Sequence, residues 1–168
     1  VDAWSDMTAL KKVGTADVSH GLKRIDWTTG VSYDEYQHDY SATNTTPGST
    51  KTSLFDALAR PYVMTDEYHV YKCIRTGRTS GGSVVASTVK PTGTSATALV
   101  ETSDTGAGAG RGYLWKYMYT VSLGQADKFM TAAYMPARTL ANTDSSTEGN
   151  RQILVQNAAA NGAIEVVE

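Results

Sequence analysis

Three histidines and a single cysteine are the side chains in this sequence that could supply metal ligands or a nucleophile. His20, His38 and His69 form no helical pair around a glutamate and match no known ligand spacing. Cys73 stands inside an apolar run, where a cysteine behaves as a small buried hydrophobe, and the sequence identifies no base that would activate it. We therefore predict no catalytic residue, no metal site and no cofactor.

The run GAGAGRG, from Gly106 to Gly112, has the composition of a phosphate-binding loop but not its spacing. Its glycines alternate with other residues, so the G-x-G-x-x-G pattern of dinucleotide-binding loops is absent. The run also leads into a predicted strand, whereas a phosphate site of this kind requires the N-terminus of a helix. We interpret it as a flexible loop.

Five carboxylates could supply an acid/base pair for glycoside cleavage, which requires two carboxyl groups about 5–9.5 Å apart. Turn and helix-cap positions explain most of them without catalysis, and a glycosidase-like enzyme is the third functional hypothesis. The five residues are Asp34, Glu35, Asp56, Asp66 and Glu67.

Aromatic side chains are a more distinctive feature, with ten tyrosines and three tryptophans. In GYLWKYMYTV, from Gly112 to Val121, aromatic residues occupy every second position, which places them on one face of a predicted strand. Such side chains can stack on sugars, anchor a protein partner or pack a core. We favour a core or a subunit interface over a ligand-stacking platform. The candidate packing or interface anchors are Trp27, Tyr33, Tyr36, Tyr113, Trp115, Tyr117, Tyr119 and Phe129.

Composition excludes several classes of protein. The chain has 168 residues, a formal net charge of −2 and no apolar run near the roughly 18 residues of a membrane-spanning helix. Lys and Arg are not clustered as general nucleic-acid binding requires. A single cysteine forms no internal disulfide, which excludes a disulfide-stabilised extracellular scaffold. We expect no membrane, nucleic-acid or small-molecule partner.

Local patterns predict short elements. We expect helices over residues 5–14, 53–59 and 122–130, the last two opening with capping-box patterns. A hairpin is expected from residues 21–27 and 31–36, and another from 62–65 and 68–75 around Asp66-Glu67. Residues 76–112 are dominated by Thr, Ser, Gly and Ala, and we interpret them as an exposed excursion with one edge strand at 83–88.

These elements predict a mainly β fold with a few short helices (α+β), a β-sandwich-like core and long Thr/Gly-rich loops. Residues 1–138 are expected to form the β-rich domain, with the loop excursion at about 76–112. Residues 139–150 are interpreted as a linker, and 151–168 as the start of a second, apparently truncated β module.

Several motifs also carry a family resemblance. RIDW (Arg24–Trp27), VYKCI (Val70–Ile74), GYLWKYMYTV and KFMTAAYMP (Lys128–Pro136) follow one another in this order. In this order they resemble the signature of a baseplate wedge subunit of contractile-tailed bacteriophages, over roughly residues 4–136. STVKPTGTS (Ser87–Ser95) is similar to a Ser/Thr-Pro-Thr stretch that precedes the aromatic strand in that family.

The resemblance implies a non-enzymatic structural role in the tail baseplate of a virion, for a protein made in the bacterial host cytoplasm. It implies other wedge proteins as partners and a homodimer within the assembly. A carbohydrate-binding β module that uses surface Tyr and Trp side chains remains the alternative from a different functional class.

Overall fold

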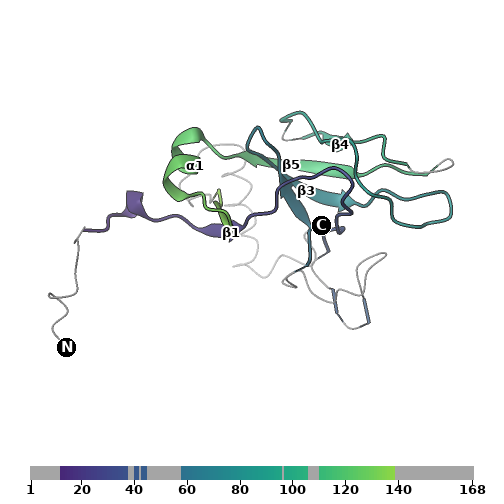
Figure 1. The fold of residues 1–168 in the computed structure, drawn as a ribbon, viewed down its shortest axis with the longest axis horizontal. Coiled ribbons are helices and arrows are strands. Elements are labelled where there is room, and N and C mark those ends of the chain that lie inside the picture. Colours follow the sequence, from purple (N-terminus) through teal and green to yellow (C-terminus); the bar gives the residue numbers. More distant parts are fainter. Residues whose placement is uncertain are drawn as a thin grey trace, which may run out of the picture. The chain divides into compact units, whose positions relative to one another are not determined.

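The computed structural model describes residues 12–37, 40–41, 43–44, 58–95, 97–105 and 110–138. The chain divides into two compact units, Val1–Pro136 and Ala137–Glu168, and only residues 137–138 of the second are described. Most of the predicted helices over 5–14 and 53–59 lies outside the described residues, as do the linker and the truncated module. The mainly β class is confirmed: the described residues of the first unit form two sheets, one α-helix and one 3-10 turn (Figure 1).

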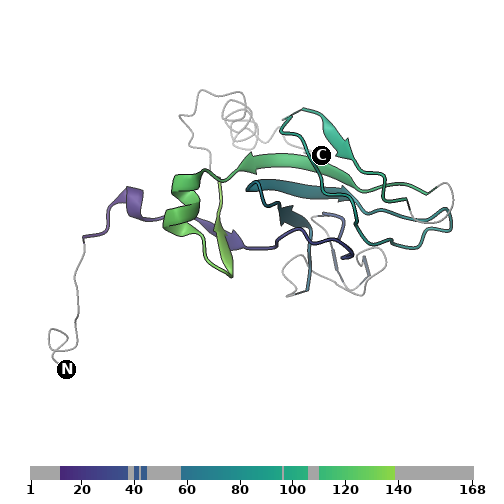
Figure 2. The same cartoon turned by 45° about the horizontal axis from the view of Figure 1, so that its top comes forward.

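The larger sheet has four antiparallel strands in the order β2-β3-β5-β4 (Figure 2). The predicted hairpin around Asp66-Glu67 is confirmed, because β2 and β3 pair directly across that turn. GYLWKYMYTV forms β5, the predicted aromatic strand, and β5 pairs with β3 along its length. The bounds are β2 Tyr62–Met64, β3 His69–Arg75, β4 Leu99–Glu101 and β5 Leu114–Thr120.

A bulge in β5 divides the aromatic stripe between the two faces of this sheet. Tyr119 pairs with Val70, but Tyr117 pairs with the adjacent Tyr71, so Met118 is an extra residue in the ladder. Paired residues of antiparallel strands share a face, and successive residues of β3 point to opposite faces. Tyr117 and Tyr119 therefore lie on opposite faces, and the prediction of a single aromatic face is correct only up to Tyr117.

Each face of the sheet consequently has its own buried cluster. The face that carries Tyr117 packs the larger cluster, and the face that carries Tyr119 packs the smaller one against the second sheet. The first cluster consists of Tyr33, Val63, Tyr71, Cys73, Tyr113 and Trp115. The second consists of Met64, Val70, Tyr119, Val121 and Met135.

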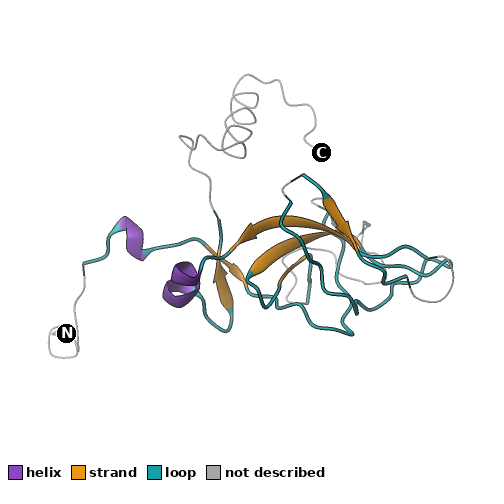
Figure 3. Ribbon diagram, turned by 90° about the horizontal axis from the view of Figure 1, so that it is seen from above, coloured by secondary structure: helices purple, strands orange, loops and turns teal. Residues whose placement is uncertain are grey.

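A two-stranded ribbon forms the second sheet. Its strands are β1 (Gly21–Lys23) and β6 (Tyr134–Pro136), which are antiparallel, and α1 (Leu123–Phe129) contacts β6 (Figure 3). The predicted capping box at the start of α1 is confirmed, since Ser122 and Gln125 bond reciprocally. We call residues 12–23 and 122–136 the ribbon module; it includes the 3-10 turn η1 (Thr15–Asp17).

The hairpin predicted from residues 21–36 is wrong. β1 pairs with β6, Asp26 forms a parallel bridge with Met64, and Val31 forms an antiparallel bridge with Ser87. Gly30, at a φ of 80°, makes a turn here, and its N–H donates to the Ser87 carbonyl at 2.7 Å. This turn connects the two runs, but they do not pair with each other, because each run pairs with a segment farther along the chain.

Residues 76–112 are only partly exposed where the structure describes them: residues 80–83 and 92–95 are exposed, whereas other parts of the segment pack into the fold. β4 lies within this segment, and residues 83–88 form isolated bridges where an edge strand was predicted. Thr76, Ser87 and Asp104 are buried. Hydrogen bonds between hydroxyl groups and the Asp104 carboxylate hold parts of this segment in the fold. Its polar composition had suggested exposure, because polar residues of this kind are common in solvated loops.

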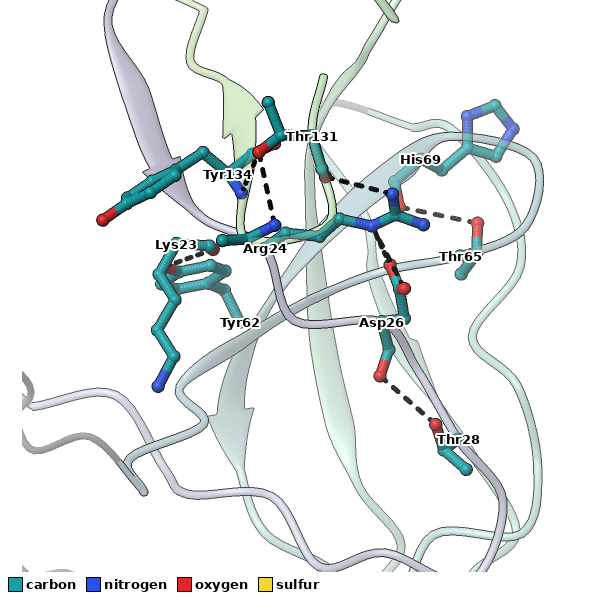
Figure 4. A network of polar contacts seen from close by, with 10 residues as sticks. Lys23, Arg24, Asp26, Thr28, Tyr62, Thr65, His69, Thr131 and Tyr134 are labelled. Atoms are coloured by element: carbon teal, nitrogen blue, oxygen red, sulfur yellow. Dashed lines mark hydrogen bonds and ion pairs between the residues drawn. The ribbon is translucent and has the colours of Figure 1, made fainter.

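Arg24 connects the ribbon to the chain that leads into the larger sheet (Figure 4). Its Nε donates to the Asp26 carboxylate at 2.9 Å, and its Nη1 donates to the Thr131 carbonyl at 3.2 Å. The hydrogen bond to Asp26 raises the pKa of the Arg24 guanidinium. Beside it, the Tyr62 hydroxyl donates to the Lys23 carbonyl at 2.8 Å. Of these contacts, the hydrogen bond between Tyr62 and Lys23 joins β2 of the larger sheet to β1 of the ribbon.

Candidate interaction surfaces

Three of the predicted aromatic anchors belong to the core. Tyr33, Tyr113 and Trp115 are at most 2% exposed. The ring centroids of Trp115 lie 5.5 Å from those of both tyrosines, edge-on to Tyr33 and stacked on Tyr113. The Tyr113 hydroxyl donates to the Val85 carbonyl at 2.6 Å, and burial raises the pKa of Tyr113 to about 12. These rings have no face available to a ligand or partner.

Tyr117 packs against the first buried cluster, and Tyr119 belongs to the second. Tyr117 is half-buried, and its ring lies edge-on to Tyr71 at 5.8 Å and to His69 at 5.9 Å. Tyr119 is 9% exposed, and its hydroxyl donates to the Pro136 carbonyl at 3.1 Å, which connects the larger sheet to the ribbon. Both residues thus pack within this chain.

The other three anchors are more accessible. Trp27 is half-buried, and its Nε1 donates to the Ser87 hydroxyl at 3.2 Å. Phe129 is half-buried at the end of α1. Tyr36 is 40% exposed, and the Lys72 Nζ lies 4.4 Å from its ring centroid. Tyr36 is therefore the most exposed of the eight anchors, and a sugar-stacking platform made of GYLWKYMYTV would require rings that are in fact buried.

Two of the nucleophile and metal-ligand candidates, Cys73 and His69, are held in structural contacts, and His38 lies outside the described residues. Cys73 is fully buried, and burial raises the pKa of its thiol, which disfavours the thiolate. His69 Nδ1 lies 2.7 Å from the Thr120 hydroxyl. No group of three or more His, Cys, Asp or Glu side chains in the described part of the chain is arranged to hold a metal ion.

The candidate carboxylates also have structural partners. Asp34 is buried and accepts the Arg60 backbone N–H at 2.8 Å, and Glu35 forms an ion pair with Arg78 at 3.4 Å. Asp66 and Glu67 lie at the exposed turn between β2 and β3, where Lys90 bonds to both and lowers the pKa of each carboxyl. Asp56 lies outside the described residues.

Half of the exposed large apolar side chains of the described residues belong to the ribbon module. Ten large apolar residues of the described chain are substantially exposed, and five of them belong to the module. Leu123 and Val13 are the most open of these, at 75% and 65% exposed. The five are Val13, Val18, Leu22, Leu123 and Tyr134; the others are Tyr36, Leu58, Val89, Leu99 and Met118.

Two polar clefts open on the described surface. One, of about 390 Å³, has three arginines and one carboxylate in its lining, namely Arg75, Arg78, Arg111 and Glu35. The other, of about 360 Å³, includes Arg24, Asp26 and Arg60. Sequence reasoning missed the three arginines because Arg111 lies far along the chain from Arg75 and Arg78, and the three match no local motif. Only the backbone pairing of residues 78 and 111 brings them together.

No family model, no curated protein and no solved structure matches the chain. Among the described residues, no helix has the length and apolar character needed to cross a membrane.

Proposed function

We propose that this chain is a structural subunit of a contractile-tail baseplate wedge, which acts by binding protein neighbours. Two of the most specific motifs of the resemblance, VYKCI and GYLWKYMYTV, lie in the paired strands β3 and β5. Both contribute to the buried clusters on either face of the sheet. The resemblance therefore concerns residues that determine the fold, which supports a shared architecture.

The apolar surface of the ribbon module is the single observation that carries a binding role. Val13 and Val18 flank η1, a turn that buries no residue, and Leu123 begins α1, which also buries none. Each costs free energy by contacting water, roughly 25 cal/mol per Å² of apolar surface. A neighbouring protein that covers the module would recover this free energy, as subunit interfaces do.

A second copy of this chain is the partner that fits the module best. Besides its apolar residues the module carries Lys12 and Asp127, and also Lys128 and Asp17, which form an ion pair at 3.1 Å, so both signs of charge are present. A twofold interface brings one patch against itself, and a patch with both signs can be complementary to its own copy. Other wedge proteins would occupy the remaining surfaces.

Locating the protein in a particle tests the baseplate assignment. Tail particles from the virus that encodes the chain would be labelled with an antibody against it and imaged by electron microscopy. We expect label at the baseplate end of the tail, with an antibody against a sheath protein as the positional control. Intact particles that lack the protein, or label confined to the capsid, would contradict the assignment.

A further inference from the structure

Three arginines, Arg75, Arg78 and Arg111, line one cleft, which we call the arginine cleft. Two of these positive charges are paired across a backbone bridge. Arg78 and Arg111 face each other in an antiparallel bridge, and each N–H donates to the other's carbonyl, at 2.7 and 2.8 Å. Residues paired in this way point their side chains to the same side, with Cβ atoms about 5 Å apart. Two like charges directly opposite each other are destabilising.

Glycines on both sides of Arg111 make this pairing possible. A Cβ at Gly110 would lie 2.0 Å from the Arg78 carbonyl oxygen, and one at Gly112 would lie 1.6 Å from the Thr102 carbonyl oxygen. Only glycine fits at either position, so Gly-Arg-Gly presses the backbone against two neighbouring segments. Arg111 itself remains exposed, and its side chain makes no hydrogen bond or ion pair with any residue the structure describes.

Acidic side chains only partly neutralise the cleft. Glu35 lies 3.4 Å from Arg78, and Glu101 forms an ion pair with Arg75. The Arg75 Nε is buried and has no hydrogen-bond partner among the described residues. Three guanidinium groups therefore share two carboxylates. Threonine and serine residues, among them Thr79 and Ser80, supply hydroxyl donors to the same lining.

We propose that the arginine cleft binds an oxyanion, supplied either by a free phosphate or by the acidic side chains of a protein partner. The guanidinium group presents its N–H donors in a planar fork that matches carboxylate and phosphate oxygens. An oxyanion between Arg78 and Arg111 relieves their mutual repulsion and accepts from both. The cleft volume of about 390 Å³ accommodates an anion of this size. This site does not depend on the baseplate proposal.

Isothermal titration calorimetry on the full chain tests the site, with inorganic phosphate in one series and a hexaglutamate peptide in another. Arg111→Gln removes one guanidinium that has no described contact to lose, and we expect about tenfold weaker binding. Arg111→Lys should bind with intermediate affinity, because an ammonium group keeps the charge but not the fork. Lys12→Gln removes one exposed positive charge from the ribbon module, and we expect wild-type affinity.

Saturable phosphate binding that Arg111→Gln weakens identifies a free anion as the source. Binding of the peptide alone, with the same sensitivity, identifies a protein partner. If Arg111→Gln fails to fold, amide chemical shifts of the wild-type chain during titration decide, and we expect the changes to centre on Arg78, Gly82 and Arg111. The proposal is overturned if neither anion binds, if the two glutamine variants bind alike, or if the shift changes lie elsewhere.

Discussion

The Asp104 carboxylate accepts two hydrogen bonds from Thr88, which lies sixteen positions earlier in the chain. One carboxylate oxygen accepts both the Thr88 N–H at 2.8 Å and the Thr88 hydroxyl at 2.6 Å. The same oxygen accepts the Val89 N–H at 3.0 Å, and the other oxygen accepts the Thr102 hydroxyl at 2.9 Å. Asp104 is only 5% exposed. A single carboxylate thus organises the polar segment that leads to the arginine cleft.

Replacing this carboxylate should destabilise the domain. Asp104→Ala leaves buried and partly buried donors without an acceptor, so we expect the free energy of unfolding to fall by about 3 kcal/mol. Denaturant titration followed by tryptophan fluorescence measures this loss. Asp127→Ala removes an exposed carboxylate from α1 and should change stability by less than about 0.5 kcal/mol. Equal stabilities for the two variants would show that the Asp104 contacts are not important.

Two glycines should respond to alanine in opposite directions. Gly112→Ala places a methyl group 1.6 Å from the Thr102 carbonyl oxygen, and we expect a loss of about 3 kcal/mol or more. Gly124→Ala places its methyl group in open space within α1, and we expect a gain of about 0.5 kcal/mol because the unfolded chain loses freedom. Thermal unfolding of both variants measures the contrast. A Gly112→Ala variant as stable as the wild type would refute the close approach.

Lys90 should contribute stability that depends on pH. Its hydrogen bonds to Asp66 and Glu67 lower the pKa of both carboxyl groups in the folded chain. A carboxyl group with a lowered folded pKa stabilises the fold above its unfolded pKa, near 4, and this contribution is lost as the pH falls through the folded value. Lys90→Met should therefore be less stable than the wild type at pH 7, and the difference should disappear in acid.

Salt provides the control for the Lys90 prediction, because these groups are exposed to solvent and mobile ions screen their attraction. High salt at pH 7 should reduce the difference between the two proteins. A stability difference that persists unchanged in acid would mean that Lys90 acts through packing and not through charge.

Local patterns predicted those parts of the fold that local chemistry determines. The hairpin around Asp66-Glu67, the strand built on GYLWKYMYTV and the helix capped by Ser122 and Gln125 all follow from residues close in sequence. Pairing between distant segments could not be predicted. The partner of β1 is β6, more than a hundred residues later, and no feature of GLK specifies it.

The candidate site was predicted less completely than the fold. The alternating pattern correctly placed Tyr113 and Trp115 on one face of the sheet. It could not reveal that Met118 is an extra residue in the ladder, which places Tyr119 on the other face. Arg75 and Arg78 lie at and just after the end of β3, whereas Arg111 comes from a distant segment, and a bridge that forms only in the folded chain brings Arg78 beside Arg111. Surface arrangements of this kind depend on topology, which single-sequence patterns do not determine.

Self-association through the ribbon module tests most directly the claim that the chain acts by binding protein neighbours. Leu123→Glu puts a carboxylate on a side chain that is 75% exposed, at the N-terminus of a helix, where negative charge is tolerated. Leu99→Glu makes the same change on β4, outside the module.

Sedimentation velocity over a range of micromolar concentrations should detect a dimer for the wild type and for Leu99→Glu. For Leu123→Glu we expect a dimer dissociation constant at least about tenfold higher, since a charge is buried in an apolar interface. A wild-type chain that stays monomeric at every concentration, or a dimer unaffected by Leu123→Glu, would contradict this account.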